Sequence, residues 1–437
     1  QPDRPPRQRA LASAFEWSHD LLSPASRALL AQLSIFRGGF VMGAAEAICD
    51  GPRIFDGVLD LCDHSFLSSQ ETAGRTRYLM LESIRGFAAA RLEPELSEPL
   101  RARHAHYFLS FAQERDAKAS GPDEATAFAE LTDELDNLRA GMGWAVSTCN
   151  DRMAAEYAAA LATFLWRCGH WQEQLECVDM GLEAAQRLDP PDVRLLGRLL
   201  YCRGVTAHDR GENQSAIEAG ERGLRVAAKA GDSEGEILFL NLLALAARRS
   251  EEPARSRRLL EKALPLSREI GHPRCQGMTL HNLGLLAQTS GDPATAERFY
   301  REALPLRSEA GDERGVAETL NNLGVLAEAD ERLAQAQTLY RDALKSYVRL
   351  RGTLEIAVAV CNLGEIAHKS GDLAGAVELL AAAATALSEL GSVHAEHAAQ
   401  AFEGARAELS QEISPAPLPW REALLTAAEK ALAEQAP

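Results

Sequence analysis

The chain has 437 residues, 46% of them hydrophobic and 25% charged, with a formal net charge of −17. This composition is too apolar for a disordered chain and too charged for a membrane protein. The longest apolar runs, Ile237–Ala247 and Leu379–Leu387, are much shorter than the roughly 20 residues that a bilayer span needs. The excess of 63 acidic over 46 basic residues argues against nucleic-acid binding through a generally basic surface.

The eight cysteines are dispersed and form no C-x-x-C pair, which is typical of small buried residues in a reducing compartment. The N-terminal segment lacks the apolar core of a signal peptide, so we expect a cytoplasmic location and no membrane partner. The sequence begins without Met, so we expect a fragment or a trimmed chain.

Residues 1–96 have the pattern of a winged-helix domain, in which several short helices precede a β-hairpin. The hairpin signal is the turn Glu-Thr-Ala-Gly-Arg between two short runs. The expected elements in chain order are helices at Leu11–Leu22, Ser26–Phe36, Met42–Cys49 and Phe55–Asp63, strands at Ser65–Gln70 and Thr76–Leu81, and a helix at Glu82–Leu92. A two-helix connector is expected over residues 97–148.

Direct DNA binding by this domain is not expected. Residues 1–100 contain 10 basic and 13 acidic residues, and the candidate recognition helix Phe55–Phe66 carries Asp56, Asp60 and Asp63. Contacts to phosphates supply most DNA affinity and require Lys or Arg at such positions. A structural role, in which the domain packs against other domains, is the better interpretation.

Residues 150–392 contain an internal repeat. The sequence Asn-Leu-Gly recurs at Asn282, Asn322 and Asn362 with a spacing of 40 residues, and turn residues such as Gly-Asp recur about every 20 residues. Turns at this spacing, with helical periodicity between them, predict antiparallel helix pairs that stack because one pair cannot bury its own apolar face. A Gly can end each helix in the left-handed conformation, and the following Asp can cap the next helix.

The pattern resembles tetratricopeptide repeats of the long, 40-residue kind, with five clear units and one degenerate unit before them. HEAT-type repeats share the period, but the Leu-Gly signature and the matched small residues favour tetratricopeptide repeats. The expected fold is therefore mostly α, with the winged helix and its hairpin followed by a right-handed superhelix of helix pairs. Residues 393–437 are expected to form a capping helix, a Pro-rich linker and a terminal helix over Trp420–Gln435 that docks back through Trp420.

Several sequence segments, taken in chain order, resemble the winged helix and helical linker of bacterial signal-transduction ATPases with numerous domains. LuxR- and AfsR-type multidomain regulators are examples of these proteins. The segments are PPRQRALASAFEWSHDLLSPASRALLAQLSIFRGGFVMGAAEAIC, HSFL, TRYLMLESIRGFAAARL, RHAHYFLSFAQ and ELDNLRAGMGWAV. The resemblance implies a nucleotide-binding module before the winged helix and a repeat sensor after it. No G-x-x-x-x-G-K-[ST] loop occurs here, so ATP or ADP is expected only on a module that precedes residue 1.

The candidate binding residues lie on the first helices of the repeat units. In tetratricopeptide arrays these helices line a concave groove, where an Asn before the Leu-Gly pair often grips the backbone of a bound peptide. An amide suits this because it both donates and accepts. The alternative is that each Asn bonds to a neighbouring helix within the stack. The candidates are Asn241, His281, Asn282, Asn321, Asn322 and Asn362, with Arg248, Gln288, Glu328 and His368 adding charge selectivity.

The leading hypothesis is a non-catalytic sensor in a multidomain ATPase or transcriptional regulator, which binds a protein or peptide in the groove and contacts the parent's nucleotide-binding module. The alternative is a free-standing adaptor. No catalytic motif occurs, and the pairs His104/His106 and His394/His397 offer only two metal ligands each, so neither catalysis nor a metal site is expected.

Overall fold

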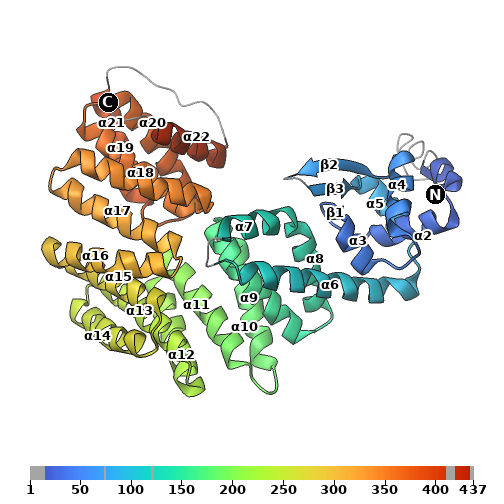
Figure 1. Ribbon diagram of the computed structural model, residues 1–437, viewed down its shortest axis with the longest axis horizontal. Helices are drawn as coiled ribbons and strands as arrows, with labels where there is room; N and C mark the ends of the chain where they lie inside the picture. The colour runs from blue at the N-terminus through green and yellow to red at the C-terminus, as the bar shows by residue number, and fades with distance from the viewer. Residues whose placement is uncertain (1–14, 73–74, 120–122, 410–418, 434–437) are drawn as a thin grey trace. The chain divides into compact units, whose positions relative to one another are not determined.

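The computed structural model describes residues 15–72, 75–119, 123–409 and 419–433, which are mostly helical with one three-stranded sheet (Figure 1). The predicted mostly α class, with a small hairpin and helical repeats, is confirmed. The chain divides into two compact units. The first contains residues 1–115 and 129–157, and the second contains residues 116–128 and 158–437. The predicted domain boundaries at residues 96, 148 and 392 stay predictions.

The first unit contains the winged-helix elements. Residues 15–21 are helical, and the part of the predicted first helix before residue 15 lies outside the described residues. The elements that follow are α2 (Pro24–Leu33), β1 (Phe40–Val41), α3 (Met42–Ile48), α4 (Ile54–Asp63), β2 (Ser68–Thr72), β3 (Arg75–Leu79) and α5 (Glu82–Ala89). Ser23 caps α2 by accepting a hydrogen bond from the Ser26 backbone N–H at 3.0 Å. Strands β2 and β3 form the predicted antiparallel hairpin.

Two features of the sheet differ from the prediction. Strand β1 was not predicted, because two residues give no periodic signal, and it pairs with β3 so that Phe40 lies opposite Tyr78. The rings of these two residues stack at 5.7 Å, and both are buried. Strand β2 begins at Ser68 instead of Ser65, because Ser65 has a φ of 60° and belongs to the turn that ends α4.

Three helices, instead of the two predicted, follow α5: α6 (Pro94–Asp116), α7 (Glu124–Asp133) and α8 (Leu135–Ser147). The ten-residue α7 was missed because a helix this short is marginal on its own and depends on packing. Here Phe128 is fully buried, and its ring meets that of Phe164 edge to face at 5.6 Å.

A buried amide joins these helices to the sheet within the first unit. Asn137 on α8 donates to the Gly39 carbonyl at 2.9 Å and accepts from the Arg37 backbone N–H at 2.7 Å. His104 on α6 lies 3.3 Å from the same amide oxygen, and burial lowers its pKa to about 4. His104 is therefore a buried residue between α6 and α8 instead of a residue on a solvated helix face.

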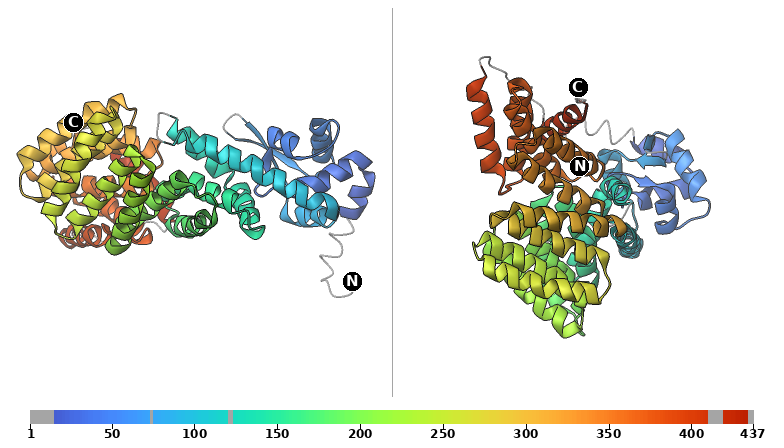
Figure 2. Two further views of the ribbon diagram at one scale, coloured as in Figure 1. Left: turned by 90° about the horizontal axis from the view of Figure 1, so that it is seen from below. Right: turned by 60° about the vertical axis from the view of Figure 1, so that its left-hand side comes forward.

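The second unit is a stack of antiparallel helix pairs that forms a superhelix (Figures 1 and 2). The pairs are α9 (Asp151–Arg167) with α10 (Trp171–Arg187), α11 (Val193–Asp209) with α12 (Asn213–Ala230), α13 (Ser233–Arg249) with α14 (Pro253–Glu269), α15 (Pro273–Thr289) with α16 (Pro293–Glu309), α17 (Glu313–Ala329) with α18 (Leu333–Arg349), and α19 (Thr353–Lys369) with α20 (Leu373–Glu389). The predicted helical repeats are confirmed.

The turns of this stack repeat with little variation. A residue with positive φ occurs at every twentieth position from Gly211 to Gly391, and Glu251, Glu331 and Arg351 adopt this conformation without being Gly. Aspartates cap the next helices as predicted; the Asp312 carboxylate, for example, accepts from the Gly315 backbone N–H at 3.1 Å. Local sequence therefore fixes both ends of most repeat helices.

The Gly of the Leu-Gly pair has a packing role. A Cβ atom on Gly284 or Gly324 would lie 2.5 or 2.6 Å from the ring of Tyr300 or Tyr340 on the second helix of the same unit. Both rings are fully buried. The missing side chain thus lets the two helices of a pair approach around a large aromatic residue.

The C-terminal helices cover the end of the array. Helices α21 (Ala395–Glu408) and α22 (Trp420–Ala433) follow α20, and the end of the predicted terminal helix and most of the predicted linker lie outside the described residues. Leu424 and Ala428 of α22 are buried in the core of the last repeats, and Trp420 packs against this core. Docking through Trp420 is confirmed. Arg421 also donates to the Cys168 carbonyl at 3.0 Å, so α22 reaches the beginning of the array.

Candidate functional site

The predicted Asn and His residues form a ladder of hydrogen bonds between successive first helices. The Asn282 side-chain NH₂ donates to Asn241 Oδ1 at 2.8 Å, and the Asn362 NH₂ donates to Asn321 Oδ1 at 3.0 Å. Between them, Asn322 Nδ2 lies 3.2 Å from His281 Nε2. Each contact joins residues 41 positions apart, so one repeat step brings the two partners together.

Threonines extend the ladder and fix the form of its histidine. Thr319 donates its hydroxyl proton to the Gly315 carbonyl at 2.8 Å, so its oxygen accepts from His281 Nδ1 at 3.1 Å. Nε2 of His281 is then free to accept from Asn322. The ring is neutral, because burial and the nearby Arg307 guanidinium hold its pKa well below the ordinary value.

The hydrogen bonds of the ladder therefore join neighbouring helices within the stack, which is the alternative interpretation of the Asn pattern. Asn241, His281 and Asn282 are buried and do not line the cavity described next, whereas Asn321, Asn322 and Asn362 do. A role for these residues in gripping a peptide stays a prediction. We restrict this prediction to Asn321, Asn322 and Asn362, which line the cavity.

A cavity of about 590 Å³ lies within the second unit, and most of its walls come from first helices of the pairs. Five of the ten predicted residues line it: Arg248, Asn321, Asn322, Glu328 and Asn362. Apolar side chains between them are Leu285, Val325, Leu354, Val358 and Val393. The volume falls in the range of about 300–1,000 Å³ that is usual for ligand pockets.

One end of the cavity contains carboxylates that already have partners. Glu328 accepts from the Tyr340 hydroxyl at 2.7 Å and from the Lys369 ammonium at 2.7 Å. Glu365 lies 2.6 Å from His397 Nε2. Tyr340 is the ring that fills the space left by Gly324, so the packing of the repeat also positions Glu328.

Two other predicted residues lie outside the lining. Gln288 accepts from the Tyr300 hydroxyl at 2.8 Å, in the position equivalent to Glu328 one repeat earlier. His368 Nε2 lies 3.2 Å from a Glu408 carboxylate oxygen. Their effect on charge selectivity stays a prediction.

The other end of the cavity is cationic. Arg248 and Arg249 end α13, and His208 lies in the last turn of α11 beside them, with Arg249 Nη2 3.4 Å from His208 Nε2. Burial and these two guanidinium groups lower the pKa of His208 to about 3. His208 is therefore neutral at physiological pH, and the positive charge at this end belongs to the arginines.

An unusual carboxyl group borders the same end. Burial raises the pKa of Asp209 to about 7, although the Trp166 indole N–H, which donates to Oδ2 at 2.8 Å, opposes this shift. The Arg249 guanidinium also opposes it. Asp209 thus changes its charge near neutral pH.

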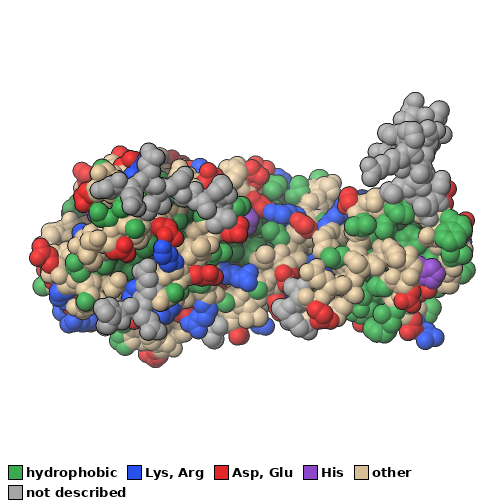
Figure 3. Space-filling model, turned by 90° about the horizontal axis from the view of Figure 1, so that it is seen from above, with side chains coloured by type: hydrophobic (Ala, Val, Ile, Leu, Met, Phe, Trp, Pro, Cys, Tyr) green, Lys and Arg blue, Asp and Glu red, His purple; other side chains and the backbone are tan. Residues whose placement is uncertain are grey.

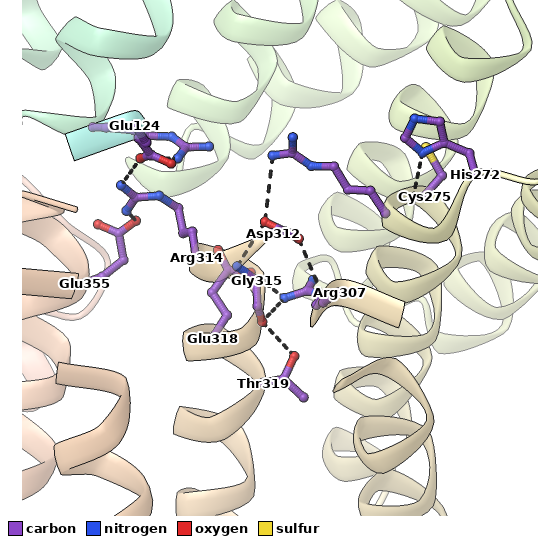
Figure 4. Close-up of polar contacts among 12 residues, drawn as sticks. Glu124, His272, Cys275, Arg307, Asp312, Arg314, Gly315, Glu318, Thr319 and Glu355 are labelled. Carbon is purple, nitrogen blue, oxygen red and sulfur yellow. Dashed lines mark hydrogen bonds and ion pairs between the residues drawn. The ribbon is translucent and has the colours of Figure 1, made fainter. Parts of the chain in front are cut away.

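A buried ion network closes the second unit near the cavity (Figure 4). One oxygen of Glu124 accepts from Arg314 at 2.6 Å and from Arg167 at 2.7 Å, and Arg314 also pairs with Glu355. All four side chains are buried or largely buried. The network joins the start of the second unit to its fifth helix pair, counted from α9, and the sequence offered no local signal for it.

Two groups of described residues bring three possible metal ligands within 4.8 Å: Glu234, His272 and Cys275, and Cys361, Glu365 and His397. The sequence could not show that His397, on α21, lies close to Cys361 and Glu365, because these two residues belong to α19. A closed structural zinc site needs four ligands. In the second group, burial raises the pKa of the Cys361 thiol to about 12, which opposes the thiolate form that binds metals. The expectation of no metal site stays untested.

Among the helices of the described residues, none combines the length and hydropathy that a membrane crossing requires. Acidic and basic side chains are interspersed on the face of the repeats that Figure 3 shows.

Comparisons with known proteins agree with the repeat geometry. The tetratricopeptide repeat family matches residues 235–309 and 275–347. A Mycobacterium tuberculosis protein named as an HTH-type transcriptional regulator is 30% identical over 182 residues, which cover 40% of this chain and 20% of that protein. The match therefore spans about a fifth of the length of this curated relative.

Solved structures to which this chain is similar include a Pyrococcus horikoshii signal-transduction ATPase with a tetratricopeptide repeat sensor, at 14% identity and a TM-score of 0.45, covering 96% of this chain and 64% of that one. A Rap protein complexed with Competence and Sporulation Factor has 12% identity and a TM-score of 0.49, covering 96% and 99% of the two chains. By the family match and the helix pairs together, residues 235–347 are tetratricopeptide repeats.

Proposed function

We propose that this chain is the sensing part of a regulator and that its repeats bind a polypeptide segment in the cavity. The observation that carries this proposal is the cavity itself, which lies on the first helices and combines amides, apolar side chains and separated charges. The 30% identical relative named as a transcriptional regulator supports a regulatory role, although the match covers only 20% of that protein.

A peptide suits the lining better than a small apolar molecule does. Asn321, Asn322 and Asn362 can offer an extended backbone both donors and acceptors, whatever its side chains are. Val325 and Val358 supply apolar contacts between these amides. Recognition of this kind needs no chemical step, so we propose a binding function without catalysis.

The winged-helix domain is proposed to contact another protein module instead of DNA. The exposed side of α4 presents Phe55 and Leu59, each at least 42% exposed, together with Asp56 and Asp63. Arg53, at the start of the same helix, is paired with Asp56. An apolar and acidic face suits a protein contact and repels phosphates. The proposed partner is the nucleotide-binding module that the resemblance to signal-transduction ATPases implies for the parent protein.

The binding proposal can be tested with peptides selected by display of random sequences on the purified chain. Val358→Trp should fill the cavity and abolish binding of the selected peptides. Ile270→Trp adds the same bulk at an exposed position outside the cavity and should leave binding unchanged. Equal affinity of both variants for the peptides would show that the cavity is not the site.

The adaptor function remains the second candidate. A reading frame that continues upstream of Gln1 into a Walker A sequence would favour the regulator. A start codon next to Gln1 would favour the adaptor, because the proposed partner module would then be absent from the same chain.

A further inference from the structure

Arg248 is a cation in the lining of the cavity, and its surroundings do not neutralise it. Arg248 lines the cavity, and its Nε is buried without a hydrogen-bond partner. Among the described residues, no carboxylate forms an ion pair with Arg248 or with Arg249, which lines the cavity beside it. Burial and the neighbouring Arg249 lower its pKa, so the site disfavours the charge that it holds.

Among the described residues of the second unit, the two fully buried arginines, Arg307 and Arg314, have acidic partners, and Arg248 is half-buried. Arg314 contacts Glu124 and Glu355, as Figure 4 shows, and Arg307 contacts Glu318 at 3.0 Å. A buried charge is costly unless it is paired and hydrogen-bonded. Arg248 therefore differs from these residues in a way that a ligand could correct.

The surroundings of Arg248 increase the positive potential instead of neutralising it. Arg249 lies beside it, and His208, which is 9% exposed, has a buried Nδ1 without a hydrogen-bond partner. Asp209 is near Arg249, but its raised pKa weakens its negative charge near neutral pH. The cavity thus has a cationic end with unused hydrogen-bonding groups.

We infer that Arg248, assisted by Arg249, binds a carboxylate of the ligand at this end of the cavity. The inference rests on the proposed function, since it assigns one part of the same binding site. A guanidinium fork matches the two oxygens of a carboxylate. Glu328 and Glu365, which line the same cavity, oppose a doubly charged phosphate more than a singly charged carboxylate.

The carboxylate can belong to the C-terminus of a peptide or to an Asp or Glu side chain, and peptide variants separate these sources. A selected peptide is compared with its C-terminal amide, with its Asp and Glu residues changed to amides, and with both changes. The change that removes the bound carboxylate should weaken binding about ten- to a hundredfold, the usual effect of losing a charged hydrogen bond. A phosphoserine version should bind more weakly than the carboxylate peptide.

Protein variants link this preference to the arginine. In Arg248→Gln the acidic and neutral peptides should bind equally, while Arg248→Lys should keep part of the preference because it keeps the charge. Arg301→Gln removes an exposed arginine outside the cavity and should behave like the wild type. Circular dichroism and thermal denaturation confirm that each variant is folded.

The outcomes separate this inference from the proposed function. If peptides bind and Val358→Trp prevents it, but the fully neutral peptide binds as tightly as the acidic one, the carboxylate site is wrong and the peptide function stands. If the phosphoserine peptide binds more tightly, the carboxylate assignment is also wrong.

If no peptide binds, the peptide function is wrong, and the thermal midpoint in sodium acetate against sodium chloride at equal ionic strength decides the inference. A ligand that binds the native state raises this midpoint. A rise in the wild type that is absent in Arg248→Gln supports the carboxylate site, and no difference between the two proteins overturns it.

Discussion

The buried ion network around Glu124 makes a sharp prediction about stability. Glu124→Gln keeps the shape of the side chain and its acceptor oxygen but removes the negative charge. Arg314 and Arg167, whose guanidinium groups both donate to that oxygen at 2.6 and 2.7 Å, would then face each other with only Glu355 to balance them. The repulsion between the two arginines also acts in the wild type, where burial and then Arg314 lower the pKa of Arg167.

The expected loss is large because the site is dry. Glu124 and Arg314 have side chains only 5% and 4% exposed. Removing one partner of a buried pair typically costs about 3–5 kcal/mol, whereas a surface pair contributes about 0–1 kcal/mol. Glu297→Gln is the matched control, since Glu297 pairs with the exposed Arg301 four residues along one helix.

Urea denaturation followed by circular dichroism measures both variants. We expect Glu124→Gln to lower the free energy of unfolding by about 3 kcal/mol or more, and Glu297→Gln by less than about 1 kcal/mol. The double variant Glu124→Gln/Arg314→Met should recover part of the loss, because the unpaired charge is removed. If Glu124→Gln and Glu297→Gln lower the free energy of unfolding by equally small amounts, the buried network does not stabilise the second unit and the reasoning is refuted.

Three further predictions concern the repeats and the cavity. Gly324→Ala places a Cβ 2.6 Å from the Tyr340 ring and should cost about 1–3 kcal/mol in thermal denaturation, whereas Gly404→Ala, with open space around it, should not destabilise. Because the pKa of Asp209 rises from 3.8 to about 7 on folding, the native state binds more protons between these pH values, and stability should fall as the pH rises through this window. Asp209→Asn should remove this dependence and be more stable than the wild type above pH 7, and an unchanged difference across pH would contradict the shift. Glu331→Gly relieves a φ of 58° and should raise the melting temperature by the equivalent of up to about 1 kcal/mol; a lower melting temperature would show that the Glu331 side chain contributes more than the strain.

The sequence predicted the features that lie within one helix pair. The 20-residue turn period, the Asp caps and the Leu-Gly pairs all act over a few residues, and the structure has helix ends at these positions. The β-hairpin of the winged-helix domain was likewise predicted from the turn between its two strands. Short elements such as β1 and α7 were missed because their stability comes from packing with distant residues such as Tyr78 and Phe164.

The candidate site could be predicted only in part from the sequence. The amide pattern identified the helices that line the cavity, but not that the amides bond to one another 41 residues apart. Nor could the sequence show that the Nε of Arg248 is left without a hydrogen-bond partner while Arg314 finds a carboxylate in Glu124, 190 residues away.

The sequence by itself determined where most of the repeat helices start and stop, because propensities, caps and turn residues act locally. Only the tertiary structure decided which charges meet, since the small rotation at each repeat step accumulates along the superhelix and brings Glu124 to Arg314 and Arg421 to Cys168. The cavity and its unpaired arginine arise from that accumulated geometry.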